Sequence, residues 1–302
     1  MNVFELISHT LGNETTTAAS FPKRYAPPQL KITIHWENGR FKSRIHQIDK
    51  RRHECATWKV MLWKNMEYSK NMKRIGKDWT VIETCPSSSK TNIFSTDPIS
   101  TTSELITHFQ RIYRKVNFSL RFENVDMGEH GLYKWKFLAQ ARMIALVDSN
   151  IYPFHIQEFQ SMLRPHQELY IDSGSVELEN APKVRKITIK TSQYFIPNKF
   201  KNYKCEHLEV LKYSMNYNDP VDFISNWLAG EHKSLKTFTL HDVDEKWVTV
   251  LLKLDECDEG PKCYKRGSKI IEFNSSRIVF SNGRMATVNF TDTGVLIFVV
   301  CD

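Results

Sequence analysis

Three groups of residues have side chains that could carry chemistry. His53, Glu54 and Cys55 are consecutive, and a cysteine nucleophile needs a histidine within hydrogen-bond range. Adjacent side chains on a strand point to opposite faces, which argues against a dyad of His53 and Glu54. Acidic residues gather at 241–245 and 255–260, where carboxylates could hold a divalent cation. A helix N-terminus in the first group and an exposed turn in the second are the simpler interpretations.

Other signatures of catalysis are missing from the sequence. It contains no GxGxxG, GxxxxGK, GxSxG or HExxH pattern. The six cysteines include no CxxC pair, and only Cys257 and Cys263 lie close together, whereas a zinc site gathers four ligands around one ion. We therefore expect no catalytic, cofactor-binding or metal-binding residues, and a protein that is not an enzyme.

The positive charge is concentrated in one part of the chain. The formal net charge is +8, and the segment from Arg40 to Lys77 alone holds twelve Lys or Arg residues against three acidic ones. Four aromatic residues accompany this charge: Trp58, Trp63, Tyr68 and Trp79. This composition suits a surface that neutralises phosphates and stacks on bases. The alternative is a solvated basic face on strands whose aromatic side chains point into the core.

Composition along the chain predicts three segments. Residues 1–29 combine a short helix over 3–11, a helix remnant, with a polar linker. Residues 30–84 form a basic, strand-rich segment that starts with a hairpin at Asn38-Gly39. A polar loop over 85–100 precedes an α/β domain over 100–302. The sequence shows neither a membrane-spanning run nor a secretion signal, so we expect an intracellular protein, cytoplasmic or nuclear, with no membrane partner.

The domain over 100–302 alternates helices and strands. A helix is predicted over 101–115, where Thr101 and Glu104 have the spacing of a capping box. A second helix begins near Asp219 and Pro220 and ends at Gly230. A third is predicted over 244–254, from its apolar stripe. The chain closes with a hairpin across 281–284 and a strand over 295–300, whose residues Val295, Ile297 and Phe298 we expect in the core.

Three of the later strands share a repeated pattern. Apolar residues stand at positions one, four and six of each block: Val184, Ile187 and Ile189, then Leu208, Leu211 and Tyr213, then Leu235, Phe238 and Leu240. The blocks begin 24 and 27 residues apart, within the 20–29 residues typical of leucine-rich repeats. An earlier degenerate block starts at His166. The pattern predicts a leucine-rich-repeat-like arrangement, and an ordinary α/β sheet is the alternative.

Two stretches near the C-terminus resemble a known family. "DFISNWLAGEHKSLKTFTL" and "SRIVFSNGRMATVNF" followed by "VLIFVVC" are similar to the type 2 F-box-associated domain of nematode F-box proteins. The residues that carry the resemblance are Trp227, Leu235, Phe238, Leu240, Gly283, Ala286 and Thr287. At Cys301 the family usually has a tryptophan. The resemblance is specific over about 205–302 and looser over about 100–204.

The resemblance implies a function in protein recognition. Members of this family carry an F-box that docks on the Skp adaptor of cullin-based ubiquitin ligases, and their associated domain is taken to select the target protein. Residues 1–29 do not show the F-box pattern, so Skp adaptor and cullin are not expected partners. The expected function is a non-enzymatic protein-interaction module with a target protein as partner. Nucleic-acid binding through residues 40–79 is the alternative.

The interaction surface is expected on the strand positions between the core residues. In a repeat-like sheet these positions face outward. The candidates are Arg185, Lys186, Thr188, Lys190, Glu209, Lys212, Lys236 and Thr239.

Overall fold

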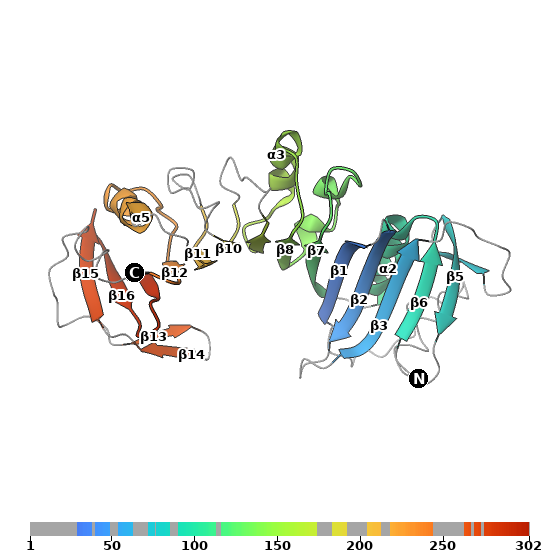
Figure 1. The fold of residues 1–302 in the computed structure, drawn as a ribbon, viewed down its shortest axis with the longest axis horizontal. Coiled ribbons are helices and arrows are strands. Elements are labelled where there is room, and N and C mark those ends of the chain that lie inside the picture. Colours follow the sequence, from blue (N-terminus) through green and yellow to red (C-terminus); the bar gives the residue numbers. More distant parts are fainter. Residues whose placement is uncertain are drawn as a thin grey trace. The chain divides into compact units, whose positions relative to one another are not determined.

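The computed structural model describes most of the chain in thirteen ranges. These are 29–37, 40–48, 54–62, 72–75, 77–84, 90–112, 116–173, 183–191, 204–212, 218–243, 263–266, 269–272 and 275–301. The helices expected over 3–11 and 244–254 and the linker before residue 29 lie outside these ranges. The described parts form a mixed α/β protein rich in strands, as the sequence predicts (Figure 1).

The chain divides into two compact units. The first comprises Met1–Val125 with Gln140–Arg142, and the second comprises Asp126–Ala139 with Met143–Asp302. The division at Val125 places the first long helix in the first unit, whereas the sequence analysis assigned it to the domain over 100–302. The reason is tertiary: that helix packs on strands from before residue 100.

In the described residues, one sheet and one helix build the first unit. The sheet order is β7 (Asn117–Glu123), β1 (Gln29–Glu37), β2 (Arg40–Ile48), β3 (Glu54–Leu62), β6 (Lys90–Ser95), β5 (Asp78–Thr84) and β4 (Met72–Ile75). The pairing of Glu37 with Arg40 closes β1 and β2 across two residues, which confirms the hairpin expected at Asn38-Gly39. β7 pairs in parallel with β1, so a segment distant in sequence extends the hairpin sheet.

Helix α2 (Pro98–Ile112) covers one face of this sheet. Its Phe109 packs edge-on against Trp58 of β3, with ring centroids 5.0 Å apart. The expected start at Thr101 is wrong, because Asp97 caps the helix: its Oδ1 accepts hydrogen bonds from the amides of Ile99 and Ser100, each at 3.0 Å. Pro98 then occupies the first helical position, where its missing amide costs nothing.

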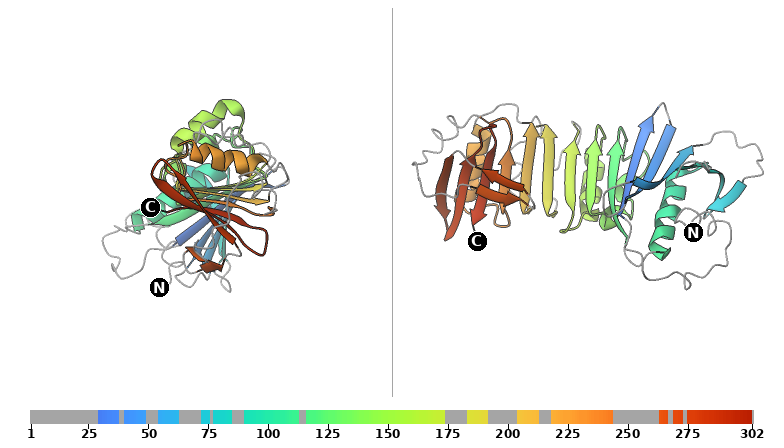
Figure 2. Two further views of the ribbon diagram at one scale, coloured as in Figure 1. Left: turned by 90° about the vertical axis from the view of Figure 1, so that its left-hand side faces the viewer. Right: turned by 90° about the horizontal axis from the view of Figure 1, so that it is seen from below.

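The second unit contains five consecutive parallel strands. They are β8 (Met143–Val147), β9 (Glu168–Asp172), β10 (Lys186–Thr191), β11 (His207–Lys212) and β12 (Thr237–Leu240), each paired with the next. The right-hand view of Figure 2 shows them side by side in chain order. Successive strands that add to one edge place equivalent residues of each strand in rows across the sheet.

Strand pairing corrects the register of one repeat block. Ile187 pairs with Leu208, and Leu208 with Phe238, while Ile189, Val210 and Leu240 form the next row. The middle block therefore uses Cys205, Leu208 and Val210, not Leu208, Leu211 and Tyr213. Leu211 is half-buried on the other face, and Tyr213 lies outside the described ranges. The blocks begin at Val184, Cys205 and Leu235, which are 21 and 30 residues apart, so the second interval exceeds the 20–29 residues typical of leucine-rich repeats.

The corrected register makes Cys205 a core residue with an unreactive thiol. Its side chain is 2% exposed, and burial raises the pKa of the thiol to about 12 by disfavouring the thiolate. Because the thiolate is the reactive form, we expect iodoacetamide at mildly alkaline pH to leave Cys205 unmodified in the folded chain. Peptide mass spectrometry measures the modified fraction of Cys205, and the urea-unfolded chain is the control. Equal labelling of folded and unfolded chain would contradict the register.

Two helices, α3 (Pro153–Met162) and α5 (Asn218–Leu228), lie on the apolar face of this sheet (Figure 1). From α5, Phe223 packs on Phe238 of β12 with centroids 4.0 Å apart, and Trp227 packs edge-on against Phe298 at 5.0 Å. The helix ends before Gly230, whose φ of 91° suits glycine. The short 3-10 helices η2 (Leu132–Lys134) and η3 (Leu138–Gln140) precede β8.

The chain ends as expected, in a hairpin and a terminal strand. β15 (Ser275–Ser281) and β16 (Arg284–Phe290) join through Asn282 and Gly283, whose φ values of 50° and 77° are those of a tight hairpin turn. β17 (Leu296–Cys301) pairs with both β16 and β12, and β13 (Cys263–Arg266) and β14 (Lys269–Glu272) form a separate hairpin. Ile297 and Phe298 are buried, whereas Val295, expected in the core, is half-buried.

The residues that carry the family resemblance lie in the closing hairpin turn or in the core of the second unit. Gly283 forms the hairpin turn, and Trp227 lies between α5 and the sheet. The other five side chains are at most 2% exposed: Leu235, Phe238, Leu240, Ala286 and Thr287.

Candidate interaction site

The polar face of the parallel strands carries most of the residues expected at the interaction surface. Lys186 of β10 pairs with Glu168 of β9 and with His207 of β11. In the next row Thr188 pairs with Glu209, and Glu209 with Thr239. The three predicted positions Thr188, Glu209 and Thr239 are thus brought into one line across three strands.

Four cations on this face form ion pairs across strands. Each contacts a carboxylate on a neighbouring strand or on the residue just before that strand. Arg185 lies 2.5 Å from Glu168, Lys186 2.5 Å from Glu209, and Lys190 2.7 Å from Asp172. Lys236 lies 3.2 Å from Glu206. Opposite charges therefore alternate across the strands, and the pairing holds long side chains in fixed positions.

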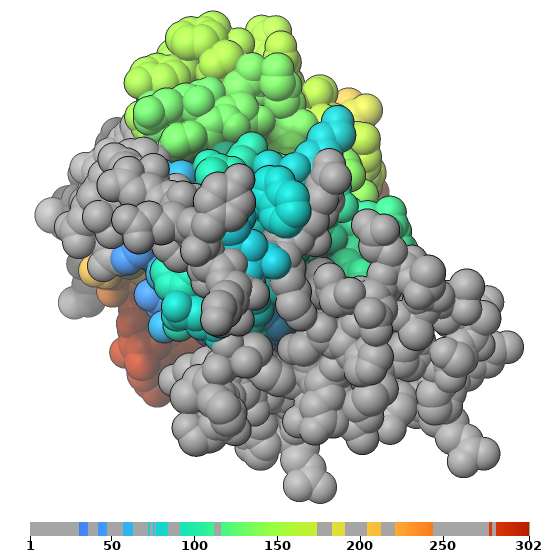
Figure 3. Space-filling view, turned by 90° about the vertical axis from the view of Figure 1, so that its right-hand side faces the viewer, coloured from blue at the N-terminus to red at the C-terminus, as the bar shows by residue number. Residues whose placement is uncertain are grey.

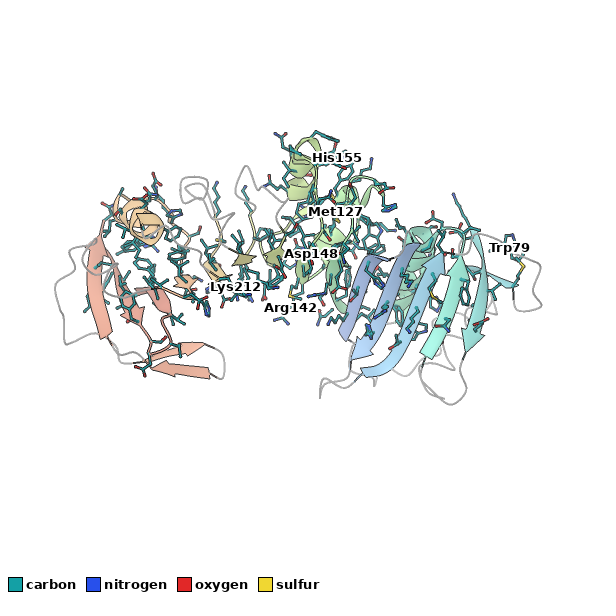
Figure 4. The ribbon with its side chains drawn as sticks, in the orientation of Figure 1. Trp79, Met127, Arg142, Asp148, His155 and Lys212 are labelled. Atoms are coloured by element: carbon teal, nitrogen blue, oxygen red, sulfur yellow. The ribbon has the colours of Figure 1, made fainter. Side chains whose placement is uncertain are left out.

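Exposure separates the predicted surface residues into two groups. Arg185, Lys190 and Lys236 have side chains that are 46%, 41% and 52% exposed and could contact a partner. Lys212 is exposed at the end of β11 (Figure 4). The expectation that all eight face solvent is wrong for Thr188, Glu209 and Thr239, which are at most 9% exposed. Each lies mid-strand with a neighbouring strand on either side, so adjacent side chains cover it.

Glu209 is the central charge of this face. Besides Lys186, it has His241 close by, with Nε2 3.6 Å from its Oε1. His207, in the neighbouring row, has Nδ1 2.8 Å from the hydroxyl of Thr237. Burial lowers the pKa of His207, although the carboxylate of Glu206 acts in the opposite direction. The imidazole is therefore held neutral at physiological pH.

Sequence reasoning missed a group of aromatic side chains where α3 begins. This aromatic cluster consists of Tyr133, Tyr152, Phe154 and His155. The rings of Tyr152 and Phe154 are parallel within 4°, with centroids 5.5 Å apart. Tyr133 stacks on His155 at 3.8 Å. Tyr152 is 44% and Phe154 73% exposed, so two large rings that touch each other remain in water.

Local contacts hold the aromatic cluster in place. Asp126 Oδ1 accepts the amides of Gly128 and Glu129 at 2.8 and 3.0 Å. Burial raises the pKa of Asp126, but these bonds and those from Tyr152 and Asn150 outweigh it and lower the pKa. The same hydrogen bond raises the pKa of the Tyr152 hydroxyl. A Cβ on Gly128 would lie 2.9 Å from the His155 ring, so this loop packs directly against the cluster.

The sequence signal for this cluster was weak. Tyr152 and Phe154 flank Pro153 in "NIYPFHIQEF", and the 3.6-residue period of α3 buries only Ile156 and Phe159. Pro153 marks the start of the helix, and Phe154 lies outside the stripe formed by Ile156 and Phe159, so the helical period places Phe154 away from the buried face of α3.

The aromatic residues of the basic segment differ in exposure, because the strands of the first sheet bury some of them and leave others in solvent. Trp58 is 2% exposed and faces α2, so its side chain points into the core, as the second interpretation of this segment predicts, and it is not available to stack on bases. Trp79 is 54% exposed. Trp63 and Tyr68 lie outside the described ranges.

The other chemical candidates are spread through the chain. His53 and residues 244–245 and 255–260 lie outside the described ranges, while Asp242 follows β12 in a left-handed conformation with φ 62°. Within the described ranges, no group of three or more His, Cys, Asp or Glu residues is placed to hold a metal ion. In the same residues, no helix combines the length and apolarity that crossing a membrane requires.

Comparisons of the whole chain with protein-family models, with curated proteins and with solved structures gave no match.

Proposed function

We propose that this chain is a non-enzymatic protein-interaction module, similar to the substrate-recognition part of an F-box ubiquitin-ligase receptor, with a leucine-rich-repeat-like second unit. The observation that carries the proposal is the exposed pair of Tyr152 and Phe154. Two rigid aromatic side chains left in water, in an otherwise polar environment, are typical of a protein-binding anchor.

A repeated backbone contact supports the leucine-rich-repeat-like arrangement. The amides of Arg185 and Lys186 both donate to the carbonyl of Gln167. One strand later Glu206 and His207 donate to Arg185, and then Lys236 and Thr237 donate to Glu206. The acceptors all occupy position two of their blocks. Repeats that stack in this way build extended binding surfaces.

The aromatic pair also has the rigidity that a binding anchor needs. Tyr152 is held by its hydrogen bond to Asp126, and Phe154 contacts both Tyr152 and His155. These contacts restrict the rotamers of the two rings, which lowers the conformational entropy lost on binding.

The surroundings of the pair indicate the chemistry of the partner. Glu158 is exposed one helical turn after Phe154, and exposed Glu129 is close enough to raise the pKa of Tyr152. A segment of a partner protein that places an apolar side chain on Phe154 and Lys or Arg beside the two carboxylates would be complementary.

The double substitution Tyr152→Ala with Phe154→Ala is expected to weaken partner binding by about 30-fold or more, since it removes two aromatic anchors. The measurement is quantitative affinity purification of the tagged full chain from cells, with partners then confirmed by titration of purified protein. Met285→Ala, at another exposed apolar residue in the second unit, is the matched control and should keep wild-type binding.

The same purification discriminates between surfaces. If Arg185→Ala with Lys236→Ala abolishes partner capture and the aromatic double variant does not, the anchor lies on the polar strand face and the assignment to Tyr152 and Phe154 is wrong. If affinity purification of the tagged wild-type chain enriches no protein over a control purification with a scrambled sequence, the interaction function itself is contradicted. Recovery of the Skp adaptor and cullin would add ligase assembly, which the sequence does not predict.

A further inference from the structure

The face of the first sheet that is turned away from α2 carries cations. Trp58 and Val60 face α2, so the alternating residues Thr57, Lys59 and Met61 face the other way. Pairing places Arg44 directly opposite Lys59, and Lys31 one row further on the adjoining strand β1. We define the basic face as Lys31, Arg44 and Lys59, which come from three neighbouring strands.

These cations have unfavourable neighbours. Like charges directly opposite one another on antiparallel strands destabilise a sheet, and Arg44 and Lys59 are such a pair. Within the part of the chain that the structure describes, neither they nor Lys31 forms an ion pair. In the second unit, by contrast, Arg185, Lys186, Lys190 and Lys236 each meet a carboxylate.

The arrangement leaves the cations accessible. Lys31 and Arg44 are exposed and Lys59 is half-buried. Neighbouring strands lie about 4.8 Å apart, so cations on adjacent strands are close enough for one extended polyanion to contact all three. An anionic ligand would remove the repulsion between Arg44 and Lys59.

Trp79 lies on the same side of the sheet. Glu83 pairs with Asn92, and Asn92 with Lys59, so residues 79, 81 and 83 of β5 share the side of Lys59. Trp79 is the only exposed large apolar side chain among the described residues of the first unit. Figure 4 shows it on β5, whose cyan surface is visible in Figure 3.

We infer that the basic face and Trp79 form a binding site for single-stranded nucleic acid, in which Lys31, Arg44 and Lys59 contact phosphates and Trp79 stacks on a base. Unstacked bases can stack on an exposed aromatic ring such as that of Trp79, whereas bases in a duplex are already stacked on one another. An anionic bilayer would require several exposed apolar side chains for insertion, and the described residues of this face offer one, Trp79.

The site is tested by fluorescence anisotropy of the full chain with a labelled single strand of about 15 nucleotides, as RNA and as DNA. The titration is repeated from about 50 to about 200 mM salt. Replacing Lys31, Arg44 and Lys59 together by Gln is expected to reduce the slope of log affinity against log salt by about 2. Trp79→Ala is expected to weaken binding about 5- to 100-fold, and Trp79→Phe much less.

The matched control replaces three exposed lysines of the second unit, Lys183, Lys204 and Lys233, by Gln. Both triple variants remove the same charge from the formal +8, and only the first should lose affinity. Four results would overturn the inference: no binding of either single strand at about 50 mM salt, equal loss in the two triple variants, tighter binding of a duplex of the same length, or binding only to phosphatidylserine vesicles. RNA and DNA bound alike leaves the shared phosphate and base chemistry as the recognised feature.

Discussion

Phe298→Ala is expected to lower the stability of the second unit by about 3 to 5 kcal/mol, the range for phenylalanine truncation in a core. Phe298 is fully buried, lies opposite Phe238 of β12 and Val288 of β16, and packs edge-on against Trp227 of α5. Its ring therefore joins the terminal strands, the last parallel strand and α5. Removing it leaves a cavity where three elements meet.

Hydrogen exchange of peptides from β12, β16 and β17 is the appropriate measurement, because a chain of two units need not unfold in one step. Phe154→Ala makes the same chemical change at a residue that is 73% exposed and should cost less than about 0.5 kcal/mol. Equal effects of the two substitutions would show that β17 is not part of the core of the second unit.

Glu209→Ala is expected to destabilise the second unit by about 2 kcal/mol. The side chain of Glu209 is 11% exposed and that of Lys186 21%, so loss of the carboxylate leaves a largely buried ammonium without its partner. Breaking a fully buried pair costs about 3–5 kcal/mol, and the remaining exposure of Lys186 reduces this figure through solvent screening.

The matched comparison for Glu209 is Glu168→Ala in the neighbouring pair. Arg185 and Glu168 have side chains that are 46% and 26% exposed, and an ion pair with that exposure contributes about 1 kcal/mol or less. The two substitutions are compared by urea unfolding, which is monitored by hydrogen exchange of peptides from β10 and β11. Replacing Lys186 and Glu209 together by Met should recover most of the loss, because no charge is then left unpaired. A cost for Glu168 as large as that for Glu209 would contradict this account of the strand face.

Local signals predicted the elements that depend on neighbouring residues. The Asn-Gly turns placed both hairpins, and Pro220 and Gly230 placed α5 to within about two residues, since turn and cap chemistry acts over a few residues. The expected N-cap was wrong, because α5 begins at Asn218 and includes Asp219.

The prediction of the first residue of α2 was wrong, because the sequence contains two capping patterns there. Asp97 with Pro98 prevails over Thr101 with Glu104. The hydroxyl of Thr101, which would have to cap the later start, instead lies 2.7 Å from the hydroxyl of Ser95.

Register was harder to predict than the existence of a strand. In β11 the residues Leu208, Val210 and Leu211 are all apolar, so the sequence alone permits Leu208 at position one or at position four of its block. Pairing with Ile187 and Phe238 selects position four, since only that register puts Cys205 and Val210 in the core.

By itself, the sequence determined the mixed α/β class, the basic segment and the closing strands, because composition and short-range periodicity encode these properties directly. Tertiary structure alone decided the pairing of β7 with β1 and the carboxylates that meet Lys186, Lys190 and Lys236. It also decided which tryptophan is buried and which is exposed, Trp58 or Trp79. These properties depend on which distant residues become neighbours, and the free energy of burying a ring or pairing a charge is determined only when those neighbours are in place.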